Sequence, residues 1–217
     1  MQMEFKENSA VKNDEIIRLE KKQDYRNVES LTRKAFWNVY RPGCWEHYIL
    51  HQYRKRADFI PELSLVVEQK GKIIGHIMYV HSEIQTDDHR LISTLTFGPF
   101  SIAPEYQHQG YGALLLKYSM DQAKQMGAGA LLIFGSASYY GKFGFVAAET
   151  KKVYLQGNLK TTDTPYFLIK ELNPGFLDGV SGTYKVPDGY YVSEEEVEKF
   201  DASFLPKEKR VRSGQLV

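Results

Sequence analysis

The sequence has very little cysteine: Cys44 is the one cysteine among 217 residues. A single cysteine cannot form an intramolecular disulfide, and this scarcity is typical of proteins kept in a reducing compartment. Long apolar runs are also missing, since none approaches the roughly 20 apolar residues of a membrane-spanning helix. The N-terminal segment, residues 1–13, is polar and lacks the apolar stretch of a secretory signal. We therefore expect a cytoplasmic protein without a membrane partner.

An excess of charge of one sign is missing as well. The chain carries 28 Lys and Arg residues against 27 Asp and Glu residues, which leaves a net charge of +1. A protein with this charge balance lacks the long-range positive electrostatic field of a dedicated nucleic-acid-binding protein. The basic segment 207–212 is interpreted as a solvated tail, so we expect no nucleic-acid partner. The remaining composition, 42% apolar with 15 Tyr and 12 Phe, is that of a globular protein rich in aromatic residues.

The apolar pattern predicts a series of strands and helices separated by turns at Gly and Pro. After residue 104 the pattern changes from that of a strand to that of an amphipathic helix, which Gly127 ends. Because one strand precedes this helix and another follows it, we expect a parallel strand–helix–strand unit attached to an antiparallel meander. Residues 15–172 are assigned to one α/β domain and residues 173–217 to a C-terminal extension. The expected strands span residues 16–19, 63–68, 73–80, 91–103, 130–134 and 166–169, and the other expected helices span residues 24–38, 45–56 and 194–200.

The most informative segment joins the strand at residues 91–103 to the amphipathic helix. It contains Gln107-x-x-Gly110-x-Gly112, and residues 107–112 are called the glycine loop below. At the start of a helix several backbone N–H groups lack partners and create a local positive potential. Glycine removes the β-carbon, so a diphosphate can approach those N–H groups closely. The loop therefore predicts an anion site built from main chain, with an ordinary strand-to-helix turn as the alternative.

Two nucleotide-binding motifs can be compared with this loop. The phosphate loop of nucleotide triphosphatases ends in Gly-Lys followed by Ser or Thr, whereas Gly112 is followed by Ala113. The dinucleotide fingerprint needs a third glycine, where this chain has Leu115, and an acidic residue about 20 positions later, where this chain is apolar. Both motifs are therefore excluded.

The glycine loop resembles the coenzyme A signature of the GNAT superfamily of N-acetyltransferases, Gln/Arg-x-x-Gly-x-Gly/Ala. The segment 139–145, called the tyrosine motif below, resembles the second signature of that family, because Tyr140 stands four residues before Gly144-Phe145. The resemblance covers about residues 15–170, and the whole chain is similar to small bacterial predicted acetyltransferases. It implies a GNAT-like fold of class α/β (α+β): a mixed, mostly antiparallel central sheet flanked by helices, with a strand–helix–strand unit that binds the cofactor and a C-terminal extension.

The resemblance also implies acetyl-CoA as a co-substrate and no metal. Backbone groups at Phe100 and Ile102 would bind the pantetheine arm in a slot between the strands that end at Ala103 and Phe134, and the glycine loop would wrap the pyrophosphate. Many relatives carry an Asn and an Ala where this chain has Ile133 and Ser136, so we expect Ser136 or Ser138 to replace that contact. The predicted cofactor-binding residues are Phe100, Ser101, Ile102, Gln107, His108, Gln109, Gly110, Tyr111, Gly112, Ser136, Tyr139, Lys142 and Phe143.

The predicted catalytic residue is Tyr140, which matches the family tyrosine that protonates the departing thiolate. A neutral, positioned phenol suits this task because a thiol with a pKa near 8.5 leaves as an anion. The base that deprotonates the amine is left open, with a chain of water molecules as a further possibility. The candidates for it are His76, His81, Glu83, Glu105, Glu46 and His47.

The aromatic segment, residues 36–48, would close over the acceptor in this family. Cys44 within it is expected to be a free, partly buried cysteine rather than an acyl carrier. His47 and His51 stand four residues apart on a predicted helix, but without a third ligand we expect no metal site.

The favoured function is an acetyl-CoA-dependent N-acetyltransferase in which a primary amine attacks the thioester directly in a ternary complex. The alternative is a non-catalytic module that binds or senses acyl-CoA. The amine stays unidentified: a protein N-terminus or lysine, a polyamine, an aminoglycoside and a small metabolite are all compatible with the sequence. We expect a monomer or a homodimer.

Overall fold

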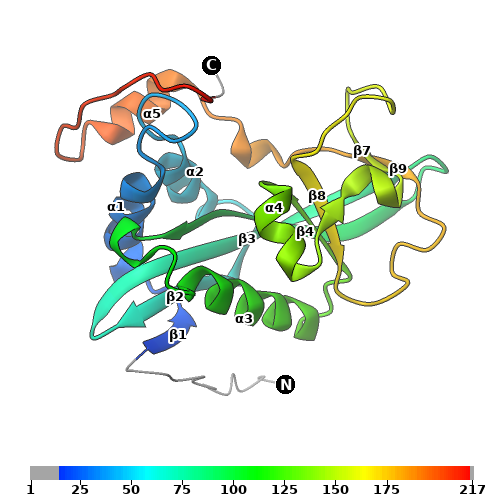
Figure 1. Cartoon of the computed structure of the whole chain (residues 1–217), viewed down its shortest axis with the longest axis horizontal. Helices are drawn as coiled ribbons and strands as arrows, with labels where there is room; N and C mark the ends of the chain where they lie inside the picture. Colours follow the sequence, from blue (N-terminus) through cyan, green and yellow to red (C-terminus); the bar gives the residue numbers. More distant parts are fainter. Residues whose placement is uncertain (1–14, 216–217) are drawn as a thin grey trace.

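The computed structural model describes residues 15–215 (Figure 1). The polar segment 1–13, expected to be frayed, lies outside the described residues. Within them, nine strands form one sheet in the order β1-β2-β3-β4-β5-β8-β6, and β9 pairs with both β3 and β7. The strands are β1 (Glu15–Leu19), β2 (Phe59–Gln69), β3 (Lys72–Thr86), β4 (Leu91–Ile102), β5 (Ala130–Phe134), β6 (Val146–Ala147), β7 (Val153–Leu155), β8 (Phe167–Glu171) and β9 (Gly182–Tyr184).

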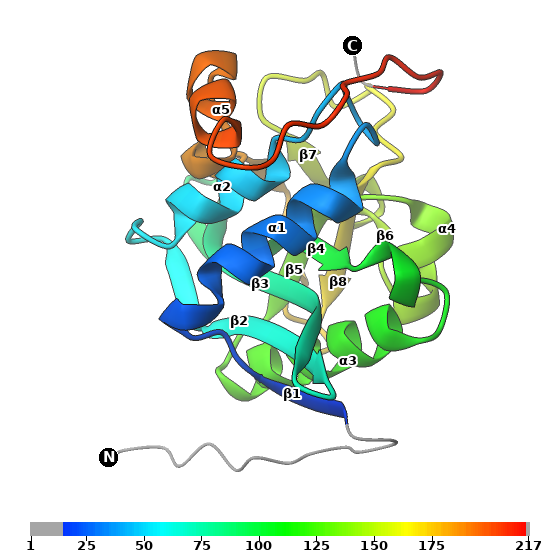
Figure 2. The ribbon, with the colours of Figure 1, turned by 90° about the vertical axis from the view of Figure 1, so that its left-hand side faces the viewer.

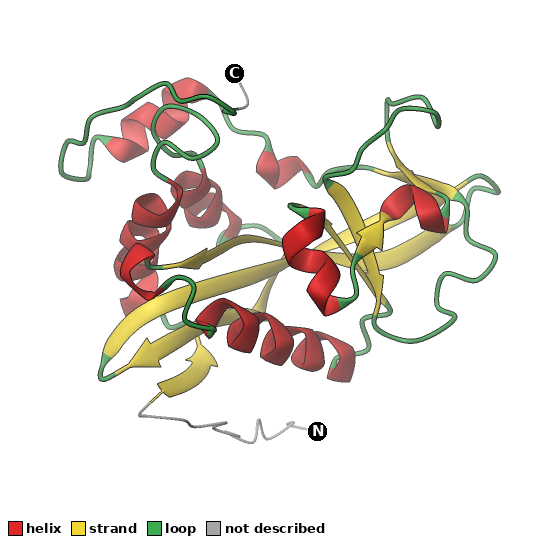
Figure 3. Ribbon diagram, in the orientation of Figure 1, coloured by secondary structure: helices red, strands yellow, loops and turns green. Residues whose placement is uncertain are grey.

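Most strand pairs are antiparallel, and the parallel pairs are β4 with β5 and β7 with β9. The helix α3 connects β4 to β5, so the expected mixed sheet with one strand–helix–strand unit is confirmed (Figure 3). The helices are α1 (Tyr25–Phe36), α2 (Glu46–Tyr53), α3 (Tyr111–Gln125), α4 (Ala137–Tyr140) and α5 (Glu194–Asp201).

The sheet is covered on both faces. Successive side chains of a strand point to opposite faces, and β3 shows the consequence. Ile77 and Tyr79 join a core cluster with Leu115 of α3, whereas Met78 and Val80 join a second cluster with residues of α1 and α2. Figure 2 shows α1 lying across one face of the sheet, with α3 on the other side. Both faces being buried explains why β3 is apolar at consecutive positions rather than at every second one.

Several strands differ from the expectation: β2 and β3 are longer than expected, and β6, β7 and β9 were not expected. β2 begins at Phe59 rather than at residue 63 and so contains Pro61. The register shifts between Ile60 and Leu65, where the missing N–H of proline is tolerated. β3 continues past Val80 to Thr86 because its polar second half keeps pairing with β4. β9 was not expected, since three residues with a glycine carry no periodicity. It exists because β3 and β7 supply its hydrogen bonds.

The C-terminal extension is part of this sheet and of its helical cover. Besides β9, it contains α5, whose Phe200 ring lies 5.2 Å from the ring of His47 in α2. The boundary at residue 172 remains a prediction. Residues 204–215, called the C-terminal strap below, correct the interpretation of segment 207–212 as a solvated tail. The side chains of residues 205–214 are exposed, but the main chain is bound: the Trp37 Nε1 group donates to Glu208 O at 2.9 Å, and Arg210 N donates to Asn38 Oδ1 at 3.0 Å.

Candidate active site

The glycine loop follows β4 and a short 3-10 turn, Pro104–Tyr106. Gly110 has a left-handed conformation, with φ of +94°, immediately before α3. The hydrogen bonds of α3 begin with Leu114 N, which donates to Gly110 O at 3.0 Å. The N–H groups of residues 111–113 therefore precede the hydrogen-bonded part of the helix, where the helix dipole is positive. This arrangement fits the phosphates of a nucleotide cofactor, which need donors and positive potential.

Gly112 brings the glycine loop and the tyrosine motif together. A β-carbon at this position would lie 2.9 Å from Tyr139 Oη and 3.5 Å from Phe100 Cζ. Glycine therefore lets a tyrosine from the second motif and a phenylalanine from β4 contact the first turn of α3. Residues far apart in the sequence, all predicted to bind the cofactor, thus meet at one helix start.

The two glutamines of the glycine loop hold its shape. Gln107 Nε2 donates to Ile102 O at 3.0 Å, and Gln109 Nε2 donates to Glu105 O at 2.9 Å. Because these two side chains bind main-chain carbonyls of the segment just before the loop, the binding surface that remains is built mostly from backbone amides. The neighbouring Tyr111 is also held, since its hydroxyl accepts a hydrogen bond of 2.7 Å from Gln69 Nε2.

The parallel pairing between β4 and β5 is short. Leu95 pairs with Leu131 and Thr96 with Leu132, and β4 has no later partner on β5 among the described residues. Phe100 and Ser101 pair with β3 on the other side. The two strands therefore diverge as expected, which leaves one main-chain edge of β4 available for a ligand. The Ser101 side chain does not contribute to that edge, since its Oγ is buried 3.1 Å from Thr32 Oγ1 of α1.

Tyr140 lies at the end of α4 in an aromatic setting. Its ring centroid lies 5.0 Å from that of Tyr139, 5.7 Å from that of Phe145 and 5.9 Å from that of Phe97. The bare Gly135 allows this position, because a β-carbon there would lie 2.3 Å from Tyr140 Cε2. Burial raises the pKa of the Tyr140 phenol. The hydroxyl consequently carries its proton throughout the neutral pH range, as a proton donor must.

The remaining predicted cofactor residues lie at the surface around these motifs. Ser136 precedes α4, and its Oγ lies 2.7 Å from Ser138 Oγ, so the two serines expected to replace the family contact share one hydrogen bond. Ile133 is buried in the core and takes no part in this pair. Lys142 and His108 are exposed, and the Phe143 ring lies 5.4 Å from that of Tyr139.

Two of the candidate bases are buried histidines. His76 lies with Nε2 3.1 Å from Ser64 Oγ and 3.8 Å from Glu20 Oε1, and burial lowers the pKa of its imidazole to about 4. His47 lies with Nε2 3.0 Å from Asp201 Oδ1, a close approach without the alignment of a hydrogen bond, and burial lowers its pKa to about 4 as well. Both are closed off from solvent, which argues against proton exchange with an incoming amine.

Two of the acidic candidates, Glu105 and Glu46, are already engaged. Glu105 accepts from Lys34 Nζ at 2.8 Å and from Lys72 Nζ at 3.2 Å, and these hydrogen bonds lower the pKa of its carboxyl to about 2. Such a carboxylate is a weak base. Glu46 Oε2 accepts from Trp45 N at 3.0 Å and from Cys44 Sγ at 3.3 Å.

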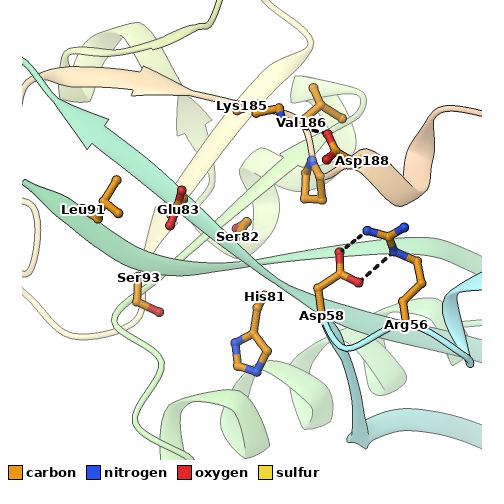
Figure 4. A pocket seen from close by; sticks show the side chains of 11 residues that line it. Arg56, Asp58, His81, Ser82, Glu83, Leu91, Ser93, Lys185, Val186 and Asp188 are labelled. Carbon is orange, nitrogen blue, oxygen red and sulfur yellow. Dashed lines mark hydrogen bonds and ion pairs between the residues drawn. The ribbon is translucent and has the colours of Figure 1, made fainter.

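His81 and Glu83 lie in a separate cavity of about 370 Å³ at the edge of β3 (Figure 4). This cavity is bordered by two ion pairs, Arg56 with Asp58 and Lys185 with Asp188. Its lining contains no residue of the glycine loop or the tyrosine motif. The structure therefore separates these two candidate bases from the predicted cofactor residues.

The aromatic segment is partly core and partly surface. Trp37 and Cys44 are buried, and burial, together with Glu46, raises the pKa of the Cys44 thiol well above its usual value. That thiol is protonated and unreactive. Arg41 stacks on Trp45, with its guanidinium carbon 3.7 Å from the ring centroid. Tyr40 is exposed, and its ring lies 5.9 Å from that of Phe36 within the same segment.

Sequence reasoning missed one contact with the predicted cofactor strand. The hydroxyl of Tyr190, in the C-terminal extension, donates to Gly98 O on β4 at 2.8 Å. The only feature of the sequence that marks this region is the turn-forming run Pro187-Asp188-Gly189.

Comparison with known proteins agrees with this geometry. The family described as "Acetyltransferase (GNAT) family" matches residues 29–145, more than half of the chain. This chain belongs to the GNAT acetyltransferase family. Within residues 15–215, no helix of this GNAT protein is long and apolar enough to cross a membrane, and no group of three His, Cys, Asp or Glu residues is placed to hold a metal ion.

Relatives of this GNAT protein occur in Escherichia coli K12. The uncharacterized N-acetyltransferase YhbS is 25% identical over 168 residues, which cover 77% of this chain and 93% of YhbS. The uncharacterized N-acetyltransferase YjhQ is 32% identical over 95 residues, which cover 43% of this chain and about half, 51%, of YjhQ.

Solved structures extend the likeness to the fold. The crystal structure of E. coli YhbS in complex with CoA has a TM-score of 0.70 at 20% identity and covers 83% of this chain and 93% of YhbS. A GNAT family acetyltransferase from Brucella melitensis, in complex with acetyl-CoA, has a TM-score of 0.65 at 25% identity and covers 83% of this chain and 100% of that protein.

Proposed function

We propose that this protein transfers an acetyl group from acetyl-CoA to a primary amine by direct attack in a ternary complex. The observation that carries the proposal is the meeting of the glycine loop and the tyrosine motif at the start of α3, where Gly112 lies against Tyr139. Support also comes from the Brucella melitensis relative, which is in complex with acetyl-CoA.

The cofactor would be held mainly by main chain. The N–H groups at the start of α3 would bind the pyrophosphate, and the free edge of β4 at Phe100 and Ile102 would bind the pantetheine arm. Such immobilisation accounts for much of the rate in a two-substrate reaction, because it replaces a random encounter by a fixed approach. Backbone N–H groups near residues 100–102 would stabilise the negative charge that develops on the thioester oxygen.

Tyr140 would complete the reaction as the general acid. The lone pair of the neutral amine attacks the thioester carbonyl carbon, the carbon–sulfur bond breaks, and the sulfur takes the phenolic proton. The Tyr140 phenol is protonated at neutral pH, so its proton is available to the leaving thiolate. The burial that raises its pKa also makes it a weaker acid, so the transfer depends on the sulfur lying directly beside the hydroxyl. The proton that the nitrogen loses returns to the phenolate or passes to solvent, so the overall reaction yields an amide and coenzyme A.

The test combines binding with catalysis. Calorimetry would measure acetyl-CoA binding, and a thiol-release assay would be run with amines from each class that the sequence leaves open: peptides, polyamines, aminoglycosides and small metabolites. Binding together with amine-dependent thiol release is the expected result. Binding without release from any amine would favour the sensing module, an alternative that the engagement of the acidic candidate bases keeps open. Absence of binding would overturn both functions.

A further inference from the structure

A bulge interrupts β4 beside the predicted cofactor edge. Phe97 pairs with Tyr79 of β3 and Phe100 pairs with Ile77, so Gly98 and Pro99 together stand opposite the single residue Met78. Gly98 has a φ of +140°, a conformation that favours glycine. A bulge leaves main-chain groups without a partner on the neighbouring strand. The Gly98 carbonyl therefore needs a hydrogen-bond donor from elsewhere in the chain.

The C-terminal extension supplies that partner. Tyr190 Oη donates to Gly98 O at 2.8 Å, across 92 positions of sequence. Burial raises the pKa of the Tyr190 phenol well above its usual value, so the hydroxyl remains a donor at all pH values at which the protein would work.

The turn that carries Tyr190 is anchored on α2. Gln52 Nε2 donates to Gly189 O at 2.6 Å, and the ring of Tyr190 lies 4.9 Å from the ring of Tyr53. A β-carbon at Gly189 would lie 2.4 Å from Tyr53 Cζ, so glycine is required for this approach. The Tyr190 hydroxyl is thus presented to β4 by a turn held at three points rather than by a loose chain end.

The bulge lies between the two halves of the proposed reaction centre. On one side of it, Phe97 packs against Tyr140, with ring centroids 5.9 Å apart. On the other side, Phe100 reaches the first turn of α3 at Gly112. The backbone conformation at Gly98 consequently sets the orientation of Phe97, next to the predicted acid, relative to Phe100, where the pantetheine arm would bind.

We propose that Tyr190 is a positioning residue for the acyl-CoA slot, which holds the β4 bulge through the Gly98 carbonyl and so makes the C-terminal extension a part of the reaction centre. This inference rests on the proposed function. It assigns a role to residues 187–190, which lie outside the two family motifs and outside the family match at residues 29–145.

The experiment compares Tyr190→Phe with Tyr53→Phe in the full-length protein. Both variants lose one phenolic oxygen from the same ring pair and keep the rings. Tyr53 Oη is buried without a hydrogen-bond partner, so its removal breaks no contact. Three quantities would be measured: acetyl-CoA affinity by calorimetry, hydrogen exchange of amides 97–102, and the thermal unfolding midpoint.

Loss of the hydrogen bond from Tyr190 should weaken acetyl-CoA binding by about tenfold and speed exchange in residues 97–102. Tyr53→Phe should match the wild type in both. A lower unfolding midpoint of Tyr190→Phe with unchanged affinity and exchange would show a merely structural role and overturn the proposal, and so would equal effects of the two variants. A wild-type protein that does not bind acetyl-CoA would instead overturn the proposed function, so the two failures are distinguishable.

Discussion

The glycine loop, predicted to bind the cofactor, and the aromatic segment, predicted to close over the acceptor, are held in different ways. In the glycine loop, Gln107 and Gln109 bind carbonyl groups five and four residues away. In the aromatic segment, Asn38 binds Arg210 N across 172 positions of sequence, and Trp37 binds Glu208 O across 171. The two glutamines of the glycine loop are therefore held by local contacts, whereas the aromatic segment depends on the opposite end of the chain.

This difference follows from what each side has to recognise. A pyrophosphate is bound by backbone amides at a helix start, and a short motif is enough to form such a site. An acceptor amine is recognised by side chains, which long-range contacts bring into place. We therefore expect changes on the cofactor side to reduce acetyl-CoA binding, and changes in the C-terminal strap to reduce amine recognition.

Gly112→Val should have the largest effect. The first carbon of the new side chain would meet Tyr139 Oη at 2.9 Å, and its methyl groups would cover the amides at the start of α3. We expect acetyl-CoA binding to weaken by at least about 100-fold, measured by calorimetry. The control is Gly141→Ala, where a β-carbon meets nothing within 4 Å. Unchanged affinity in the valine variant would contradict the anion site at this helix start.

Tyr140→Phe should lower turnover on the order of 100-fold, the smaller end of what general-acid catalysis contributes. Acetyl-CoA affinity should stay nearly the same, because the ring and its contacts with Phe97 and Phe145 remain. The rate of thiol release and the dissociation constant of acetyl-CoA would be measured on the same preparation. Equal turnover of the two proteins at every pH would remove Tyr140 from the role of acid.

Asn38→Gly tests the acceptor side. Asn38 has a φ of +59°, which glycine adopts without strain, so the variant removes the side-chain contacts with Gly43 N, Glu208 O and Arg210 N and little else. We expect the KM for the amine to rise about tenfold, with an unchanged dissociation constant for acetyl-CoA. Val211→Ala, which shortens an exposed side chain of the strap, is the matched control. A change confined to acetyl-CoA affinity would reverse the assignment of the two sides.

The pH dependence of stability should show the smallest effect. Burial lowers the pKa of His47 to about 4 in the folded protein. The neighbouring Asp201 raises this pKa, but its effect is smaller than that of burial, and Arg33 and Arg26 of α1 lower the pKa further. The unfolded chain binds a proton at His47 below a pH of about 6.5, whereas the folded protein does not. Stability should therefore fall by about 1 kcal/mol between about pH 7 and about pH 5.5 through this group.

His47→Phe provides the comparison for that measurement. Phenylalanine fits the surrounding rings of Phe200 and Phe204, which lie 5.2 Å from the imidazole, and it cannot bind a proton. Denaturant unfolding at the two pH values should show a smaller loss of stability in the variant. His76 would supply the remaining dependence, since its pKa is lowered to about 4 as well. Identical slopes in the two proteins would mean that His47 is not held neutral.

Sequence patterns predicted the parts of this protein that depend on neighbours in the chain. The amphipathic period of α3, the glycines before it and the spacing of Tyr140 from Gly144 are local features, and the structure joins the two motifs at Gly112. Helix ends were displaced by a few residues, as for α2, which spans Glu46–Tyr53 rather than 45–56. End positions depend on which terminal residues find partners, and periodicity does not contain that information.

Contacts between distant segments were not predictable in this way. β9 has three residues, and its hydrogen bonds come from β3 and β7. Tyr190 and Asn38 are polar residues in turns, and nothing local distinguishes them from exposed turn residues until Gly98 and Arg210 are placed beside them. The same holds for His81 and Glu83, which share a strand with the buried His76 but line a cavity to which His76 does not contribute.

Local sequence thus accounts for the family, the order of the main elements and the proposal of an anion site made of backbone amides, because helix periodicity, turn geometry and a helix start all arise within a few residues. The tertiary structure accounts for the hydrogen bond from Tyr190 to the bulge at Gly98, for the contact of the C-terminal strap with Asn38, and for the burial of His47 and His76. Those features require side chains from opposite ends of the chain to meet, and their energies exist only after the sheet has brought them together.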